Sequence, residues 1–322
     1  MQREITERRG FTVVELMIVI SIIALLAAMA ASALSNAAEQ ARAQRTRSII
    51  NKIDQLIMEK WDGFRTRSVP YRGVYNENVK VRAQNRLNAI REIQRMELPE
   101  RRSDVINITN PTTLEAPVSG VATSSLLRAY FRKVYAWTGG NPANWTEQYQ
   151  GAECLYLILS CMRDGDQSAL EYFTASEIGD VDGDGMPEIL DGWGRPIEFL
   201  RWAPGYTRES PVGTLTHQTI DASVAPDPFN PMKLEGAGNF ALTPLIYSAG
   251  PDGEYEVNVN IRVSTSQPED SPMRYTTTTP PNNPYLTDVD DSTILVGSVL
   301  DLDGDTHHGW TDNITNHYRG DQ

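Results

Sequence analysis

The feature that most constrains this chain is an uncharged apolar run near its N-terminus. The run extends from Leu16 to Leu34 and contains 19 residues. A helix of that length crosses the ~30 Å hydrocarbon core of a bilayer. Neither glycine nor proline occurs from Phe11 to Asp62, so the helix is expected to continue for 52 residues, a length of about 78 Å. Gly63 is the expected end of this helix.

Three interpretations of this segment compete: a permanent membrane anchor, a removable secretory signal, and a buried helix of a soluble protein. Small residues at positions 28–30 and 31–33 are typical of signal cleavage sites. Two observations oppose a removable signal. Glu15 places a carboxylate at the head of the apolar run, where an unpaired acid is costly. The helical spacing of apolar residues also continues beyond the run, from Ile49 to Trp61.

Charge is unevenly distributed along the chain. Residues 1–102 contain 18 Lys and Arg against 11 Asp and Glu, a net charge of +7, whereas residues 103–322 contain 11 against 31, a net charge of -20. Nucleic-acid binding depends on clustered Lys and Arg, so we expect no nucleic-acid partner. Common motifs for nucleophilic, zinc and nucleotide chemistry are missing from the sequence, so we expect no catalysis.

The sequence RRGFTVVELMIVISIIALLAAMA, residues 8–30, resembles the N-terminal cleavage and methylation motif of type IV prepilins and pseudopilins. Basic residues, Gly, Phe, Thr, Glu and the apolar run all fall in register. The resemblance implies cleavage by prepilin peptidase between Gly10 and Phe11, and N-methylation of Phe11. It also implies a single-pass protein of the inner (cytoplasmic) membrane with its C-terminal head in the periplasm.

The same resemblance implies a role in assembly for Glu15. As the fifth residue of the mature chain, Glu15 would pair with the N-terminal amine of a neighbouring subunit in a helical filament. A buried carboxylate is tolerated only against a matched charge, and the amine released by cleavage supplies one. The implied partners are other pseudopilins, an assembly ATPase, an inner-membrane platform protein and membrane lipid.

The rest of the chain divides into a helical region and an acidic region. After a leader (1–10) and the long helix (11–62, with its membrane segment at 16–34), we expect a helical insert region at 63–178 and an acidic β-rich region at 179–322. Periodicity predicts helices at 81–96, 124–137 and 147–162, strands at 197–202, 243–248, 255–263 and 293–299, and a polar insert at 264–284. The predicted fold is α+β and pilin-like: a long N-terminal helix packed on a small antiparallel sheet, with extra helices and long loops.

Two side-chain environments follow from the expected helices. Cys154 and Cys161 lie seven positions apart, and on a helix roughly 10 Å would separate their Cα atoms, beyond the ~7 Å of a disulfide. They are interpreted as two core residues on one helix face. The arginines of the 81–96 helix are expected to form a solvated face or to contact anionic lipid.

An acidic loop near position 180 has the spacing of a calcium site. Asp180, Asp182 and Asp184 occupy loop positions one, three and five, Gly185 follows at six, and Asp191 is at twelve. Alternate carboxylates turn inward around a hard cation and glycine permits the tight bend, as in an EF-hand loop. We expect Ca²⁺ here, against the alternative of a plain Asp/Gly turn.

A second stretch repeats this spacing less completely. It contains Asp301, Asp303, Asp305 and Asp312, but Thr306 replaces the glycine. Three histidines, His307, His308 and His317, lie nearby. Zn²⁺ prefers a spaced His/Cys set and carboxylates favour a hard ion, so the histidines are interpreted as surface residues.

A further resemblance covers about a quarter of the chain. The segments DGWGRPIEF, YSAGPDG and DNITN, which begin at residues 191, 247 and 312, are similar to successive C-terminal motifs of the major pseudopilin of type II secretion systems. In that family the last two segments form a calcium-binding loop beside a small sheet. The resemblance implies that Ser248, Asp252 and Asp312 are calcium ligands. Asp301, Asp303 and Asp305 are expected as additional local ligands. Three features differ from the family: a long insert between Gly253 and Asp312, a large region at 64–150, and His317 where an aromatic Trp is expected.

The sequence therefore predicts a pseudopilin-type subunit of a type II secretion pseudopilus with a calcium-stabilised head. Two other functions stay open. One is a minor type IV pilin for adhesion, motility or DNA uptake, and the other is a membrane-anchored calcium-binding protein that does not polymerise.

Overall fold

The computed structural model describes residues 12–69, 78–118, 120–206, 218, 221–236, 238–261, 283–300 and 312–317. Several expectations concern residues outside this part of the chain. They are the cleavage site at Gly10 and Phe11, the carboxylates of Asp301, Asp303 and Asp305, the histidines His307 and His308, and nearly all of the insert at 264–284.

The long helix α1 extends over Val13–Thr66 and contains 54 residues. It begins at a capping box, in which Thr12 is the N-cap and Glu15 is the third helical residue. The helix continues through Gly63, the position expected to end it, for three further residues. Phe64 explains this difference, because it is buried and its ring packs edge-on against Trp61 with centroids 6.3 Å apart.

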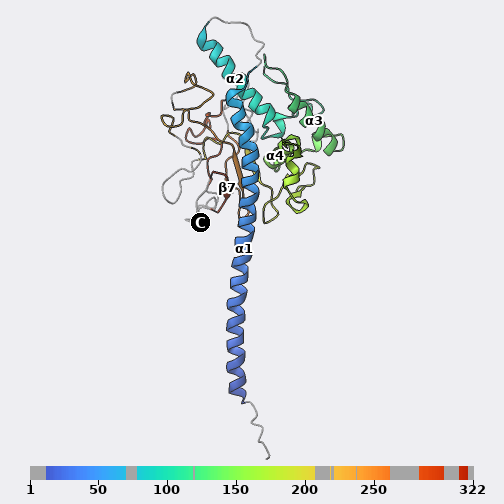
Figure 1. Ribbon diagram of the computed structural model, residues 1–322, viewed down its shortest axis with the longest axis vertical. Coiled ribbons are helices and arrows are strands. Elements are labelled where there is room, and N and C mark those ends of the chain that lie inside the picture. The colour runs from blue at the N-terminus through green and yellow to red at the C-terminus, as the bar shows by residue number, and fades with distance from the viewer. Residues whose placement is uncertain are drawn as a thin grey trace, which may run out of the picture.

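The two halves of α1 have different surroundings (Figure 1). The N-terminal half projects away from the folded head. Every large apolar residue from Val13 to Leu34 is exposed in the single chain. The C-terminal half lies along the head and buries one stripe of its surface. The buried residues of this stripe recur at helical spacing: Thr46, Ile49, Ile50, Ile53, Asp54, Leu56, Ile57, Trp61 and Phe64.

Three more α-helices form most of the insert region, and all three were predicted. They are α2 (Val79–Glu97), α3 (Ser125–Trp137) and α4 (Gln150–Cys161). Asn78 and Ser124 cap the first two through side-chain hydrogen bonds to backbone amides. α3 and α4 lie to one side of α1 in Figure 1 and contact each other. Short 3-10 turns η1 to η4 occupy Arg102–Asp104, Pro142–Asn144, Ala169–Tyr172 and Ala175–Glu177.

Seven short strands complete the described fold. The central sheet has the antiparallel order β5-β6-β7 and consists of Glu198–Leu200, Leu245–Ser248 and Ile314–Thr315. Its register pairs Phe199 with Ile246 and Ser248 with Ile314. β6 and β7 contact α1, while β5 contacts α4. Two antiparallel ribbons pair β1 (Arg163–Asp164) with β2 (Gln167–Ser168), and β3 (Ile178–Gly179) with β4 (Glu188–Ile189). The small antiparallel sheet packed on a long N-terminal helix confirms the α+β, pilin-like expectation.

Two of the expected strands, 255–263 and 293–299, do not form. Their described residues meet at a single antiparallel bridge between Val257 and Val299. Backbone hydrogen bonds flank the bridge, for example from the Leu300 amide to the Glu256 carbonyl at 2.8 Å. Glu256 has a positive φ of 46° and Gly297 one of 87°. These left-handed conformations interrupt a regular ladder that alternation in the sequence alone would predict.

The expectation of a solvated arginine face on α2 is correct for one half of the helix and wrong for the other. Arg82 and Arg86 are exposed, whereas Arg91 and Arg95 are buried. The Arg91 guanidinium pairs with Asp227 at 3.1 Å and with Glu235, while Arg95 pairs with Glu92 at 2.7 Å. Burial of these charges is tolerated because each guanidinium has carboxylate partners. α2 is therefore joined to the acidic region by ion pairs.

Two single-residue expectations have opposite outcomes. Cys154 and Cys161 both lie on α4 and are free thiols, which confirms the prediction of two unlinked residues. His317, expected at the surface, is buried. Its ring packs edge-on against Tyr206 with centroids 5.5 Å apart and contacts the Pro244 carbonyl at 3.1 Å. A ring at this position fills a slot in the core, whichever aromatic residue supplies it.

Candidate functional site

The first candidate site is the start of α1. The Thr12 backbone amide and hydroxyl donate to the Glu15 carboxylate at 2.9 and 2.8 Å, and the Glu15 amide donates to the Thr12 hydroxyl at 3.2 Å. Both residues are exposed. The carboxylate that a neighbouring amine would neutralise is thus held at the helix start, where the helix dipole also favours a negative charge.

The apolar half of α1 is the second element of this site. The apolar stretch of α1 (Val13–Thr66) is long enough to span a membrane, and none of it is buried inside the head. A helix with apolar residues on all sides requires lipid or other helices around it. α1 is therefore long and apolar enough to anchor the chain in a membrane by a single pass.

The acidic loop after β3 folds as a tight turn held by its own aspartates. The Asp180 carboxylate accepts hydrogen bonds from the Gly183 and Gly185 amides at 2.8 and 3.1 Å. The Asp184 carboxylate accepts from the Met186 amide at 2.8 Å. Gly183 and Gly185 both have positive φ angles, so glycine permits the bend as the spacing predicted.

Carboxylates gather beside this loop, and two of them were not predicted. Oxygens of Asp180, Asp182 and Glu188 lie within 4.8 Å of one another, and so do oxygens of Glu153, Asp182 and Asp184. Glu188 is at loop position nine, where EF-hand loops often place a ligand, so this residue could have been found from spacing. Glu153 comes from α4, and its only signal was a lone acid within an apolar helical run.

Burial changes the acidity of this group of carboxyls. Burial and then the neighbouring Asp182, Asp180 and Asp184 raise the pKa of Glu188 to about 8. Burial, followed by the same kind of repulsion, raises the pKa of Glu153 to about 10, although the Trp145 indole opposes this rise.

The pKa of Asp184 is also raised, again by burial first. The ionised forms of these carboxyls are therefore poorly solvated, and at neutral pH Glu153 and Glu188 hold protons in the metal-free chain.

Asp191, the expected ligand at position twelve, joins neither group of carboxylates. Its Oδ1 accepts from the Trp193 and Arg195 amides at 2.8 and 2.9 Å, and its Oδ2 accepts from the Ser248 hydroxyl at 2.6 Å. Asp191 thus holds the turn before β5 and ties that turn to β6. Ser248, expected to bind calcium, is engaged in the same bond.

The structure does bring Asp252 and Asp312 together. The Asp252 amide donates to Asp312 Oδ2 at 3.4 Å, and the loop packs tightly there, because a Cβ on Gly250 would lie 2.6 Å from the Asp312 carbonyl oxygen. Burial, followed by the Asp252 charge, raises the pKa of Asp312 to about 6. Asp312 Oδ1 is buried and has no hydrogen-bond partner among the described residues. Two carboxylates and this oxygen fit a hard cation, while the Ser248 hydroxyl donates to Asp191.

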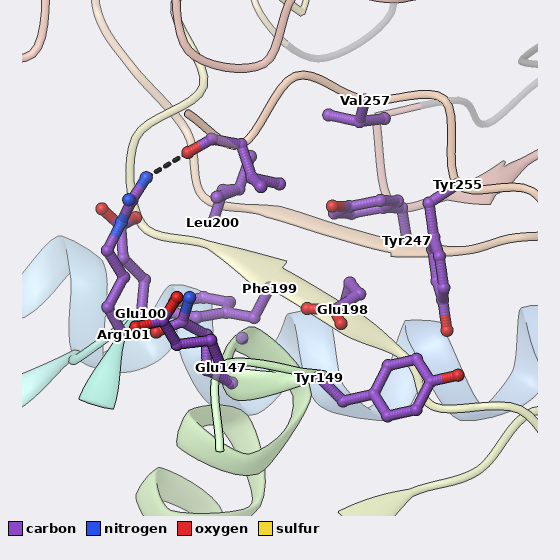
Figure 2. Close-up of a pocket in the computed structure, with 13 residues that line it drawn as sticks. Glu100, Arg101, Glu147, Tyr149, Glu198, Phe199, Leu200, Tyr247, Tyr255 and Val257 are labelled. Atoms are coloured by element: carbon purple, nitrogen blue, oxygen red, sulfur yellow. Dashed lines mark hydrogen bonds between the residues drawn. The ribbon is translucent and has the colours of Figure 1, made fainter. Parts of the chain in front are cut away.

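A cavity of about 200 Å³ lies where the N-terminus of α4 meets β5 and β6. In Figure 2, Glu198 lies between the rings of Tyr149 and Tyr247. Burial raises the pKa of Glu198 to about 7, against hydrogen bonds from the Ala152 and Phe199 backbone.

The other polar groups around this cavity serve the fold. Arg101 donates to the Val259 carbonyl, and the Tyr255 hydroxyl donates to the Pro196 carbonyl at 2.5 Å. We therefore interpret the cavity as a packing feature around the capped end of α4.

Comparison with known families bears on the start of α1. Residues 6–31 match the family model described as the prokaryotic N-terminal methylation motif. The chain carries a type IV pilin-like prepilin motif. Searches of curated proteins and of solved structures found no match to the chain. The motif supports a type IV pilin-like subunit, a structural protein that prepilin peptidase processes and that packs with other pilins in a filament.

Proposed function

We propose that this chain is a pseudopilin-type subunit of a type II secretion pseudopilus, cleaved after Gly10 and polymerised through α1. The observation that supports it best is the division of α1. A methylation motif at residues 6–31 leads into an exposed apolar half, and the other half is built into the head. Such a subunit is stored in lipid through the first half and presents the head outside the bilayer.

The proposal gives Glu15 an assembly role. Its carboxylate is exposed and accepts only from Thr12 among the described residues. In a filament the apolar halves of several α1 helices would surround it, and an acid in that environment requires a positive partner. The N-terminal amine of an adjacent cleaved subunit is such a partner.

The orientation of the subunit follows from charge. Arg8 and Arg9 precede the apolar run, and basic residues stay on the cytoplasmic side of a membrane. The head would then lie in the periplasm, and the subunit would be extracted from the inner membrane by an assembly ATPase and a platform protein.

Calcium is proposed to stabilise the head at the loop before β7. Asp252 and Asp312 would hold the ion, supported by their proximity and by the buried oxygen of Asp312. When bound, the ion would supply the positive charge that these two carboxylates lack. Asp301, Asp303 and Asp305 precede this strand in the sequence and are proposed as further ligands.

Intact mass and N-terminal sequencing of the membrane-extracted protein test the processing step. A chain that starts at N-methylated Phe11 supports the proposal. A chain that starts at Met1 would leave only an anchor, and one that starts near Ala31 would contradict a filament subunit.

Assembly is tested by cross-linking between copies in the membrane. Glu15→Val should abolish cross-linked filaments while cleavage and membrane location persist, and Glu59→Gln, which alters an exposed acid farther along α1, is the matched control. Secretion in a strain that lacks the chain, compared with twitching and DNA uptake, separates the secretion function from that of a minor type IV pilin.

A further inference from the structure

Five carboxylates converge from two distant segments on the side of the head that carries α4. Asp180, Asp182 and Asp184 come from the loop between β3 and β4, and Glu188 is the first residue of β4. Glu153 comes from the first turn of α4. Asp182 belongs to both groups of closely spaced oxygens. The two groups therefore adjoin through Asp182, and neither includes Asp252 or Asp312.

Most oxygens of the cluster already accept one hydrogen bond. The Thr146 hydroxyl donates to Asp182 at 2.7 Å, and the Thr146 amide donates to Asp184 at 2.6 Å. On the glutamates, Oε2 of Glu188 accepts from the Val181 amide at 3.1 Å, and Oε2 of Glu153 accepts from the Trp145 indole at 2.5 Å. These bonds orient the carboxylates toward one another.

Two oxygens of the cluster are left without a partner. They are Oε1 of Glu153 and Oε1 of Glu188, both buried without a hydrogen bond in the described part of the chain, and both residues are 0% exposed. A buried carboxylate oxygen without a donor is strongly disfavoured. Unlike the exposed aspartates of a common Asp/Gly turn, these two oxygens point to something that binds them.

No counter-charge to this cluster comes from the part of the chain that the structure describes. Within the described ranges, none of the five carboxylates has an Arg, Lys or His partner within 4.0 Å. The buried ion pairs elsewhere in the head show the contrast, since Arg201 is paired with both Glu100 and Asp104. A group of acids that lacks such a partner requires either protons or a bound cation.

We propose that Asp180, Asp182, Asp184, Glu188 and Glu153 bind a calcium ion that joins α4 to the loop between β3 and β4. All the ligand atoms are carboxylate oxygens, which suit a hard cation and not Zn²⁺. Ca²⁺ accepts six to eight oxygens in flexible geometry, whereas Mg²⁺ demands a small octahedral shell and retains water. Five carboxylates from a loop, the start of β4 and a helix match the many oxygen ligands that Ca²⁺ accepts.

The bound ion would lock three segments of the head together. Thr146 joins the turn before α4 to the loop, and a Cβ on Gly185 would lie 2.7 Å from the carbonyl oxygen of Trp137, the last residue of α3. α4 also contacts β4 directly. Calcium would thus fasten the helical insert to the acidic region.

Calcium titration of the full-length chain, purified in detergent and freed of metal with a chelator, tests the proposal. Affinity is measured by calorimetry in an Asp252→Asn/Asp312→Asn background, which removes the other proposed site. Trp145 is a local reporter because its indole donates to Glu153, so its fluorescence should change on binding and the change should be lost in Trp145→Phe. In this background, with the five carboxylates of the cluster unchanged, the chain should bind Ca²⁺ at least about tenfold more tightly than Mg²⁺.

Two variants test whether the glutamates found in the structure bind the ion, and a third tests the aspartate that the EF-hand spacing predicted. Glu153→Gln and Glu188→Gln should each weaken Ca²⁺ binding by roughly tenfold or more, because each removes a charged ligand. Both should keep the thermal stability of the metal-free chain, since a neutral amide of nearly the same shape replaces a buried carboxyl whose ionised form is disfavoured. Asp191→Asn, which alters the residue at position twelve, should leave Ca²⁺ affinity unchanged, as should Asp166→Asn, an exposed control.

Several outcomes would overturn the proposal. They are the absence of a Ca²⁺-dependent Trp145 signal, equal affinities in the two glutamine variants and the parent, or a loss of affinity in Asp191→Asn alone. Equal affinity for Mg²⁺ would overturn the assignment to calcium. None of these readouts depends on cleavage or filament assembly, so the proposed secretion function can fail independently.

Discussion

The two halves of α1 belong to one continuous helix and yet depend on different partners. The half from Val13 to Leu34 is apolar on every side and is not covered by the head, whereas the half from Thr46 to Phe64 is apolar along one stripe, and that stripe is buried. One continuous helix can therefore present an apolar surface to a membrane along one half and pack on the head along the other. The periodicity of its apolar side chains decides which surroundings suit each half.

The acids on the two halves show the same difference. Glu15 is exposed and bonds only to its own helix start in the described structure, while Asp54 is buried and accepts from the Asn316 amide at 2.8 Å. The partner of Asp54 lies within this chain, beside β7. The proposed partner of Glu15 lies in another copy.

The largest effect should come from removal of a buried ring in the head half. Trp61 is 2% exposed and packs edge-on against Phe229 with centroids 5.9 Å apart. Trp61→Ala should lower the free energy of unfolding of the head by about 3–5 kcal/mol, measured by chemical denaturation of the full chain in detergent. Ile23→Ala in the membrane half is the control and should leave that value unchanged. A similar loss in both variants would show that the halves are not independent.

A smaller effect should come from the buried acid of the head half. Asp54→Ala leaves the Asn316 amide without one of its acceptors, so the head should lose about 1–3 kcal/mol of unfolding free energy. Glu15→Gln should leave the same denaturation curve unchanged because Glu15 does not contact the head. If Asp54→Ala were neutral, the tie between α1 and the segment beside β7 would contribute little.

The third test locates the pH dependence of the head outside α1. The folded pKa of Glu198, about 7, lies above its ordinary value of 4.5, so the folded state binds the extra proton. Protonation of Glu198 therefore contributes to the free energy of unfolding of the head. This contribution is fully present below pH 4.5 and is lost as pH rises through 7, by roughly 1–2 kcal/mol after allowance for partial exposure. Glu198→Gln should reduce this fall in Tm between pH 5 and 8, and the remainder belongs to Glu188, Glu153 and Asp312, whose raised pKa values act in the same direction. An unchanged fall would show that Glu198 contributes none of it.

The smallest effect concerns the first turn of the membrane half. Thr12→Ala removes the hydroxyl that accepts from the Glu15 amide, which should cost about 1 kcal/mol locally. Hydrogen exchange in detergent should be faster at residues 13–16 and unchanged in the buried stripe. Thr12→Ser is the matched control. Faster exchange throughout α1 would mean that the two halves unfold together.

Prediction from the sequence succeeded where one local rule governs a segment. Helix formation over Val13–Thr66 follows from helix-forming residues without an internal break, and Ser124 was placed at the start of a helix that it caps. Local rules failed at Glu256, whose left-handed backbone ends a strand that alternation predicted. They also failed at Arg91, because the carboxylates that bury it, Asp227 and Glu235, are more than 130 residues away.

The acidic loop shows the same contrast between features that local rules predict and features that they do not. Its turn, with Asp180 and Asp184 bonded to their own backbone, could be predicted from spacing. The surroundings of Asp191 could not, because its carboxylate accepts a hydrogen bond from Ser248 of β6, which is 57 positions away in the sequence. The placement of Glu153 depends on how α4 packs on β4.

The sequence by itself determined the membrane-length helix, the methylation motif at residues 6–31 and the turn of the acidic loop. Each depends on side chains within a few positions of one another, so the chain encodes it locally. Tertiary structure alone decided which acids meet: Asp191 with Ser248, Glu153 with Asp182, and Asp252 with Asp312. Electrostatic contact acts through space, and only the packing of α1, α4 and the sheet sets those distances.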